Sequence, residues 1–275
     1  MNLLSTLTIT LLLSTVSGAC RSTDPYGTAE SLPEDTAPVD PSNTCQAAKQ
    51  NPDAPLAHTV NTLIRTMAAA DCEAMMVRLA QVHHLDLTGR SLSDLGPLQY
   101  ARSLESLDIS NNRVRDLAPL VYLSTLKRLY VSRNNLRFLP PMHEWNRLTE
   151  LNVAANKITD ISPVMTMTAL ESLDLSMNQI RSAEALENVP SLRVLYADDN
   201  IISDVSPLAR NLKLEQLHMA KNAVLDLRPL ADLAALRHVS YLDLSDNPIS
   251  RSGCPLNGES EAITTFCQNT FVDRN

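Results

Sequence analysis

Glycine and aromatic residues are scarce in this chain of 275 residues. It has only 6 glycines, and it contains neither GxGxxG nor GxxxxGK(S/T), so the Gly-rich loops that hold nucleotide phosphates are excluded. Aromatic residues make up 4% of the chain and hydrophobic residues 44%, so the core must consist mainly of Leu, Ile and Val. Such a core suits thin repeated layers better than an irregular globule.

The chain also lacks an excess of positive charge, since its net charge is −8. Proteins that bind nucleic acid need a positive face for the phosphate backbone, so no nucleic-acid partner is expected. The hydrolase patterns HExxH and GxSxG do not occur, and the 6 His residues are scattered. We therefore expect no cofactor, and a binding protein rather than an enzyme.

The N-terminus predicts export. Residues 3–16 form an uncharged apolar run, which is shorter than the ~20 residues of a membrane-spanning helix. The small residues 17–19 suit signal-peptide cleavage, so residues 1–19 are interpreted as a signal peptide. Because Cys20 follows directly, the segment resembles a bacterial lipobox, which implies lipidation of Cys20 and anchoring to a membrane. The alternative is a secreted protein with Cys20 free or removed.

Residues 20–44 combine four prolines with Ser, Thr and five acidic residues. This composition cannot bury enough apolar surface to fold, so it predicts a disordered tether. Of the five cysteines, Cys20 would carry lipid. Two of the other four precede the repeats and two follow them, which favours the local disulfides Cys45–Cys72 and Cys254–Cys267. A metal site is disfavoured because no CxxC or CxxH spacing occurs.

From Val82 onward the chain repeats the pattern LxxLxLxxNxL with a period of 22 residues. Seven units begin at Val82, Leu104, Leu126, Leu148, Leu170, Leu192 and Leu214, and an eighth begins at Val239. The first, fourth and sixth residues of each unit are apolar, and those between them are mostly polar, as in a strand with one buried face. Stacked units would form one continuous parallel sheet over one continuous core.

The predicted fold is an α/β solenoid, a right-handed leucine-rich repeat horseshoe or arc. It would have about eight repeats over residues 82–250, a parallel sheet on the concave face and short 3₁₀ or turn arms. The ninth column would form a structural ladder of amides that satisfy backbone groups at the turn: Asn112, Asn134, Asn156, Asn178, Asn200, Asn222 and Asn247. The first repeat has Arg90 there. Trp145 falls in an apolar arm column and is expected in the core.

Both ends of a solenoid expose core and require caps. Residues 45–81 show helical periodicity and predict an N-terminal helical cap that Cys72 fastens to Cys45. Residues 251–275 predict a C-terminal cap, in which Ile263 and Phe266 cover the last layer.

The 22-residue unit with N-x-I-x-D-I/L-x-P-L resembles the internalin-like class of bacterial leucine-rich repeat proteins, and the Cys-containing ends resemble the capped versions on bacterial surface lipoproteins. The resemblance covers about residues 45–267. It implies a curved solenoid that binds through its concave sheet, but it names no partner. No internalin surface-attachment motif is visible, so a role in host invasion is not implied.

Outward columns of the sheet supply the candidate binding surface, which is mixed in charge and centred on two tyrosines, a residue type favoured at interfaces. The candidates are Arg128, Tyr130, Arg133, Asn152, Asp174, Arg193, Tyr196 and His218. The alternative is that these are ordinary solvent-facing strand residues. A metal at His83, His84 and Asp86 is disfavoured because adjacent strand residues face opposite sides. Calcium at the fifth-column Asp residues is disfavoured because Tyr130 and Asn152 interrupt them.

The sequence thus predicts a non-enzymatic protein of the bacterial envelope, lipid-anchored at the outer membrane or surface, or else secreted. It would bind a protein, or alternatively a glycan, through the concave sheet. One alternative function is a structural envelope component that contacts its own copies or cell-wall polymers. Another is an inhibitor of a secreted hydrolase.

Overall fold

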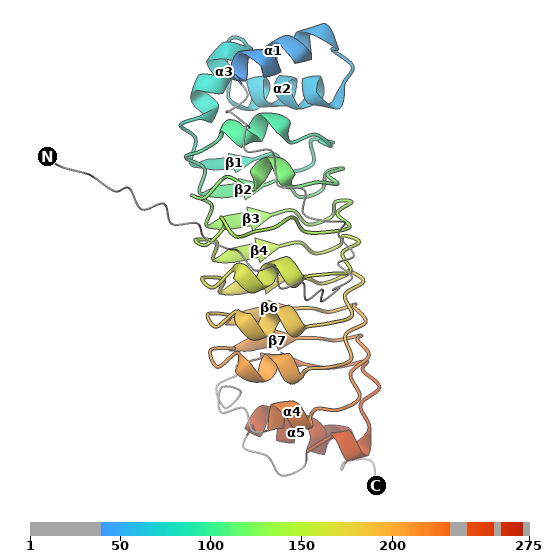
Figure 1. Ribbon diagram of the computed structural model, residues 1–275. Helices are drawn as coiled ribbons and strands as arrows, with labels where there is room; N and C mark the ends of the chain where they lie inside the picture. The colour runs from blue at the N-terminus through green and yellow to red at the C-terminus, as the bar shows by residue number, and fades with distance from the viewer. Residues whose placement is uncertain (1–39, 232–240, 256–259, 272–275) are drawn as a thin grey trace, which may run out of the picture. The chain divides into compact units, whose positions relative to one another are not determined.

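The computed structural model describes residues 40–231, 241–255 and 260–271. The predicted signal peptide, the lipidation site Cys20 and residues 20–39 of the predicted tether lie outside these ranges. A helical cap is followed by a ladder of short strands, and further helices follow at the C-terminal end (Figure 1). Within the described ranges, no helix is both long and apolar enough to cross a membrane.

Eight three-residue strands form one sheet. They are β1 (His84–Asp86), β2 (Ser106–Asp108), β3 (Arg128–Tyr130), β4 (Glu150–Asn152), β5 (Ser172–Asp174), β6 (Val194–Tyr196), β7 (Gln216–His218) and β8 (Tyr241–Asp243). All neighbours are parallel, and the spatial order follows the sequence order. From β1 to β7 each residue pairs with the residue 22 positions further on, for example Leu107 with Leu129. The predicted repeat frame and the leucine-rich repeat fold are confirmed.

Return arms connect the strands, and most contain a short 3₁₀ helix. These are η1 (Gly96–Tyr100), η2 (Ala118–Leu120), η3 (Ser162–Thr166), η4 (Glu184–Asn188) and η5 (Ser206–Arg210). The third repeat, which the structure describes in full, runs from β3 to β4 without one. Its arm carries Pro140 and Pro141, and a proline disfavours helical backbone in the residue before it. The expected short arms are therefore confirmed.

The core lies between the sheet and the arms. Leu107 and Ile109, from the fourth and sixth columns, are fully buried. Trp145 is also fully buried, and its indole Nε1 donates to the Leu120 carbonyl at 3.0 Å. The ring therefore fills the layer of the third repeat while its single polar atom is satisfied, as the prediction of a core position requires.

The asparagine ladder binds neighbouring turns together. In the fourth repeat, Asn156 Nδ2 donates to the carbonyls of Val153 and Val131, each at 3.0 Å. Its Oδ1 accepts from the Leu136 amide at 2.9 Å. One buried amide thus satisfies backbone groups of its own repeat and of the preceding one. The same pattern recurs along the ninth column.

The eighth column precedes the ladder and has a left-handed backbone conformation. Its φ angles are positive at Gly89, Asn111, Arg133, Ala155, Met177, Asp199, Lys221 and Asp246. Each non-glycine residue in this region costs roughly 1–2 kcal/mol, so the ladder must hold the turn in place. The prediction that Arg133 lies in the sheet is wrong, because the chain has already turned at this column. Arg133 therefore sits on the turn after β3.

The N-terminal cap consists of α1 (Pro41–Gln50), α2 (Pro55–Thr66) and α3 (Cys72–Leu79). It begins earlier than the expected boundary at Cys45. Asp40 caps α1, since its Oδ1 accepts from the Ser42 amide at 2.9 Å, and Pro41 occupies the first turn, where prolines are tolerated. The predicted disulfide Cys45–Cys72 joins α1 to α3.

The cap contacts the first repeat through side chains of α2. Thr59 Oγ1 donates to the Asp94 carbonyl at 2.7 Å. His58 Nε2 lies 2.8 Å from the carbonyl of Arg90, the residue that stands in the asparagine column. The cap is thus hydrogen-bonded directly to the first repeat.

At the C-terminal end, α4 (Arg228–Ala231) lies between β7 and β8, and η7 (Arg251–Gly253) and α5 (Glu261–Phe271) follow β8. The second predicted disulfide, Cys254–Cys267, ties η7 to α5. Ile263 is fully buried against the core, and Phe266 packs on it while partly exposed. Both residues thus contact the core at this end, and the bounds of the C-terminal cap stay a prediction.

Candidate functional site

The sheet face, defined here as the outward residues of the second, third and fifth columns, carries most of the predicted binding residues. Arg128 and Tyr130 lie on β3, Asn152 on β4, Asp174 on β5, Tyr196 on β6 and His218 on β7, with Arg193 directly before β6. Those on the strands alternate with buried leucines and are themselves partly exposed. The register aligns the fifth-column residues in one row along the sheet.

Three rings stack at the C-terminal end of this row. The ring centroids of Tyr196 and His218 are 4.4 Å apart and the planes are tilted by 35°. The His218 ring is in turn stacked on Tyr241, with centroids 4.3 Å apart and an angle of 17°. We call Tyr196, His218 and Tyr241 the aromatic stack. Aromatic pairs at such distances stabilise one another, so the stack is a preformed apolar surface.

Tyr241 was missed by the sequence analysis. It belongs to the third column, whereas Tyr196 and His218 belong to the fifth. The period-two pattern of a strand places both columns on the same face, and adjacent strands bring diagonal neighbours within reach of large side chains. Reading the third and fifth columns together would have found it. Tyr241 is also the most open member of the stack, with 49% of its surface exposed.

Carboxylates surround the stack. Partial burial raises the pKa of Asp198, although a bond from the Ala220 amide at 2.7 Å and the nearby His218 act in the opposite direction. The pKa of Asp243 is lowered, mainly because its carboxylate accepts from the Ser245 amide. Aromatic faces flanked by carboxylates attract cationic groups. This end of the sheet face is therefore suited to a ligand that presents Lys or Arg side chains.

The N-terminal half of the predicted surface is engaged in contacts of its own. The Tyr130 hydroxyl donates to the Glu150 carboxylate of the next strand. Burial, followed by this bond, raises the pKa of Tyr130 to about 12. Arg128 Nε contacts Ser106 Oγ at 3.4 Å. Glu150 was missed because its role depends on a diagonal contact between repeats.

The residues between these two clusters have local structural roles. The Asn152 Oδ1 accepts from the Ala154 amide at 3.0 Å, and Asp174 Oδ1 accepts from Ser176 at 3.0 Å. Asn152 Nδ2 also donates to Asp174 Oδ2 at 3.1 Å. The eight predicted residues therefore do not form one continuous patch, but a tyrosine–glutamate cluster, an amide–carboxylate link and the aromatic stack.

Wherever the fifth column is Asp or Asn, its side-chain oxygen accepts a hydrogen bond from the backbone amide two residues later. The acceptors are Asp86, Asp108, Asn152, Asp174 and Asp243, at 2.8–3.0 Å. Tyr130, Tyr196 and His218 interrupt this series. At His218 the amide is satisfied differently, since the Ala220 amide bonds Asp198 of the preceding repeat. The aromatic positions thus give up a local turn bond.

The expectation that the protein holds no metal stays a prediction. His84 and Asp86 share the outward face of β1, as expected from strand alternation, and both are exposed. Within the part of the chain that the structure describes, no three His, Cys, Asp or Glu residues come together as a metal site. The expectation that the protein is not an enzyme stays a prediction.

Comparison with known proteins gives a consistent picture. Models of the leucine-rich repeat family match residues 146–202, and residues 100–117 and 235–254. The solved structure of internalin C2 from Listeria monocytogenes is 25% identical, with a TM-score of 0.64, over 70% of this chain and 85% of that one.

The protein is an internalin-like leucine-rich repeat protein.

Two further structures share the fold of this internalin-like protein. A leucine-rich repeat protein of Leptospira interrogans is 20% identical over 66% of this chain and 53% of its own, with a TM-score of 0.56. The Arabidopsis receptor kinase HAESA, solved with the peptide hormone IDA and the co-receptor SERK1, is 22% identical over 76% and 35%, with a TM-score of 0.54. No curated protein sequence matches the chain significantly. The leucine-rich repeat fold of this internalin-like protein is suited to protein–protein interaction.

Proposed function

We propose that this internalin-like protein binds a partner protein through its sheet face, with the aromatic stack as the main contact. The observation that carries this proposal is the stack itself. Tyr196 and His218 stand in the column where five repeats place a turn-forming Asp or Asn, and Tyr241 stands in a column where two repeats place Ser. Exposed aromatic residues held rigid at low entropic cost are favoured as contacts at interfaces.

The charges beside the stack favour a basic epitope on the partner. Asp198 and Asp243 flank His218, and Glu215 lies in an ion pair with Arg193 at 2.5 Å. A Lys or Arg side chain would be attracted both by the ring faces and by the carboxylates. A glycan ligand remains the alternative, and the absence of a nucleic-acid partner stays a prediction.

A photo-reactive residue tests the contact directly. The full chain would carry a benzophenone amino acid in place of Tyr241, and a matched chain would carry it in place of Tyr122, which is 62% exposed on a return arm. We expect crosslinks to a partner protein from position 241 and none from position 122. Equal crosslinking from both positions would contradict the proposal, and crosslinks only to further copies of the chain would favour the structural-component alternative.

We also propose that the chain is exported and held on a bacterial envelope by lipid at Cys20, with residues 1–19 removed and residues 21–39 as part of the tether. The support is the apolar run ending in small residues directly before Cys20, together with the two disulfides, which belong to oxidising compartments. Metabolic labelling with an alkyne fatty acid tests this. The label should enter the wild-type chain and be absent from Cys20→Ser; an unlabelled wild type would leave secretion as the alternative.

A further inference from the structure

A group of cations lies outside the sheet, on the arms that lead from the asparagine turns toward the 3₁₀ helices. We call it the basic strip, and its members are Arg113, Arg115, Arg137, Lys157 and Arg181. All are exposed, and none forms an ion pair with any residue that the structure describes. In a chain with a net charge of −8, such a concentration of unpaired positive charge is not accounted for by the fold.

Backbone bonds hold the basic strip in register. The Arg113 amide donates to the Leu92 carbonyl, and the Lys157 amide donates to the Leu136 carbonyl, each at 2.8 Å. Neighbouring arms are therefore about one strand spacing apart, ~4.8 Å. Arg115 and Arg137 occupy the same column on adjacent arms, so their like charges repel at this spacing unless an anion lies between them.

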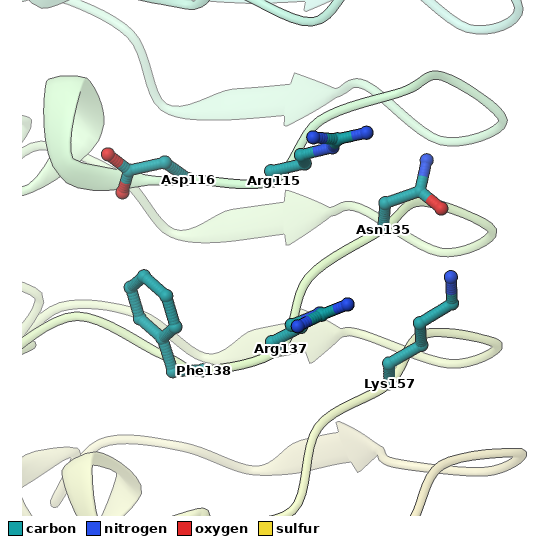
Figure 2. A pocket seen from close by; sticks show the side chains of 6 residues that line it. All are labelled: Arg115, Asp116, Asn135, Arg137, Phe138 and Lys157. Atoms are coloured by element: carbon teal, nitrogen blue, oxygen red, sulfur yellow. The ribbon is translucent and has the colours of Figure 1, made fainter.

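A pocket of about 430 Å³ opens among these side chains, lined by Arg115, Asp116, Asn135, Arg137, Phe138 and Lys157. Figure 2 shows the guanidinium groups of Arg115 and Arg137 extended toward the same side, with the ends of Asn135 and Lys157 also on that side. The Asp116 carboxylate lies on the other side, where it accepts from the Ala118 amide at 2.8 Å. It therefore does not neutralise the pair of arginines.

Phe138 adds an apolar wall. It replaces the turn-capping Asp that most repeats carry at this position, exemplified by Asp116, and half of its surface is exposed. A solvent-facing phenyl ring in place of a capping carboxylate loses a turn bond and removes a negative charge beside Arg137. Both changes favour an anionic ligand that also has an apolar face.

We propose that the basic strip binds an acidic polysaccharide, a polymer whose sulfate or carboxylate groups reach Arg115 and Arg137 while a sugar ring packs on Phe138. The guanidinium fork matches planar carboxylate and tetrahedral oxyanions, and the Asn135 amide can bond sugar hydroxyls. The strip spans four adjacent arms, which suits a chain of repeated charges rather than one small ion. A nucleic acid is also a repeated anion, and it is the competing occupant that the binding test separates from the polysaccharide. This site is separate from the aromatic stack.

Binding of defined polymers to the full chain tests the proposal. The probes are heparin as a sulfated polysaccharide, polygalacturonate as a carboxylated one, neutral dextran, and single-stranded oligothymidylate. The variant is Arg115→Gln with Arg137→Gln. The control is Arg147→Gln with Lys213→Gln. It removes the same charge from two exposed cations that form no ion pair among the described side chains, and each lies directly before the start of a repeat.

We expect heparin or polygalacturonate to bind, more weakly as salt is added, and dextran not to bind. The Arg115→Gln, Arg137→Gln variant should lose at least about tenfold in affinity, as expected for two charge-assisted contacts, and the control should keep its affinity within about twofold. Phe138→Asp should also weaken binding. Failure of both acidic polysaccharides, equal losses in variant and control, or tighter binding of oligothymidylate would each overturn the proposal.

Discussion

The ninth and fifth columns of the repeats are both polar, yet they behave differently. The ninth column keeps Asn from the second repeat to the eighth, and each amide bonds backbone groups of two repeats, as Asn156 does. The fifth column supplies one backbone bond, within its own turn, as Asp108 does, and is replaced by aromatic residues three times. A position that joins repeats is uniform, whereas a position with only a local role is free to acquire a contact surface.

Among the substitutions that test this difference between the two columns, Asn156→Ala is expected to have the largest effect on stability. The change leaves the Leu136 amide and the carbonyls of Val131 and Val153 without the side-chain partner in a buried turn. We expect the free energy of unfolding to fall by about 3 kcal/mol, measured by urea denaturation. A loss below about 1 kcal/mol would show that the ladder is not essential.

Asn152→Ala is the matched substitution in the same repeat, four residues earlier. It removes the bond to the Ala154 amide and the contact to Asp174, both at a partly exposed site where water can replace them. The expected loss is about 1 kcal/mol in the same urea experiment. If the two variants were equally destabilised, the distinction between the two columns would fail.

Tyr130 provides a test at alkaline pH. Its folded pKa is raised to about 12 from an ordinary value of 10.0, so the folded chain holds this proton after the unfolded chain has lost it. Stability should therefore decline as pH rises from about 10 to 12, and one phenol should ionise late in ultraviolet absorbance. Tyr130→Phe should remove the late phenol and reduce that decline. An unchanged titration in the variant would contradict the Tyr130–Glu150 contact.

The smallest effect is expected at Asp198, which lies beside the aromatic stack. Because burial raises its folded pKa, the charged form is disfavoured in the fold, and stability is lost as pH rises from the unfolded value of 3.8 through the folded pKa. Asp198→Asn keeps an oxygen for the Ala220 amide and removes the charge. Urea denaturation should therefore show unchanged or greater stability at pH 7, with little difference at pH 3. A clear loss at pH 7 would contradict this assignment.

The repeat architecture of the molecule could be predicted because the same sequence pattern recurs in each repeat. The 22-residue period, the asparagine ladder, both disulfides and the buried Trp145 all follow from recurring columns or from the placement of cysteines. Features that occur once were missed. Tyr241 and Glu150 act through diagonal contacts between repeats, and the cap starts at Asp40 because a single capping carboxylate and Pro41 extend the helix into a segment of tether-like composition.

The contact residues are harder to predict from the sequence, because each of them also occurs only once. The predicted residues Asn152 and Asp174 carry outward side chains, but their bonds serve the turns. Arg133 was placed by column counting, which does not show where the strand ends and the left-handed turn begins. Outward positions recur less strictly than the asparagine ladder, so only the structure shows which side chains already have local partners.

The central claim is that aromatic residues on the sheet face create a contact surface at the loss of a hydrogen bond that stabilises the turn. The most direct measurement combines urea denaturation and partner crosslinking for the double variant Tyr196→Asn, Tyr241→Ser, which introduces residues that the chain itself uses in these columns. We predict a free energy of unfolding within about 1 kcal/mol of wild type, since a regained turn bond offsets lost ring packing, and loss of the partner. A folded variant that still bound the same partner would contradict the account.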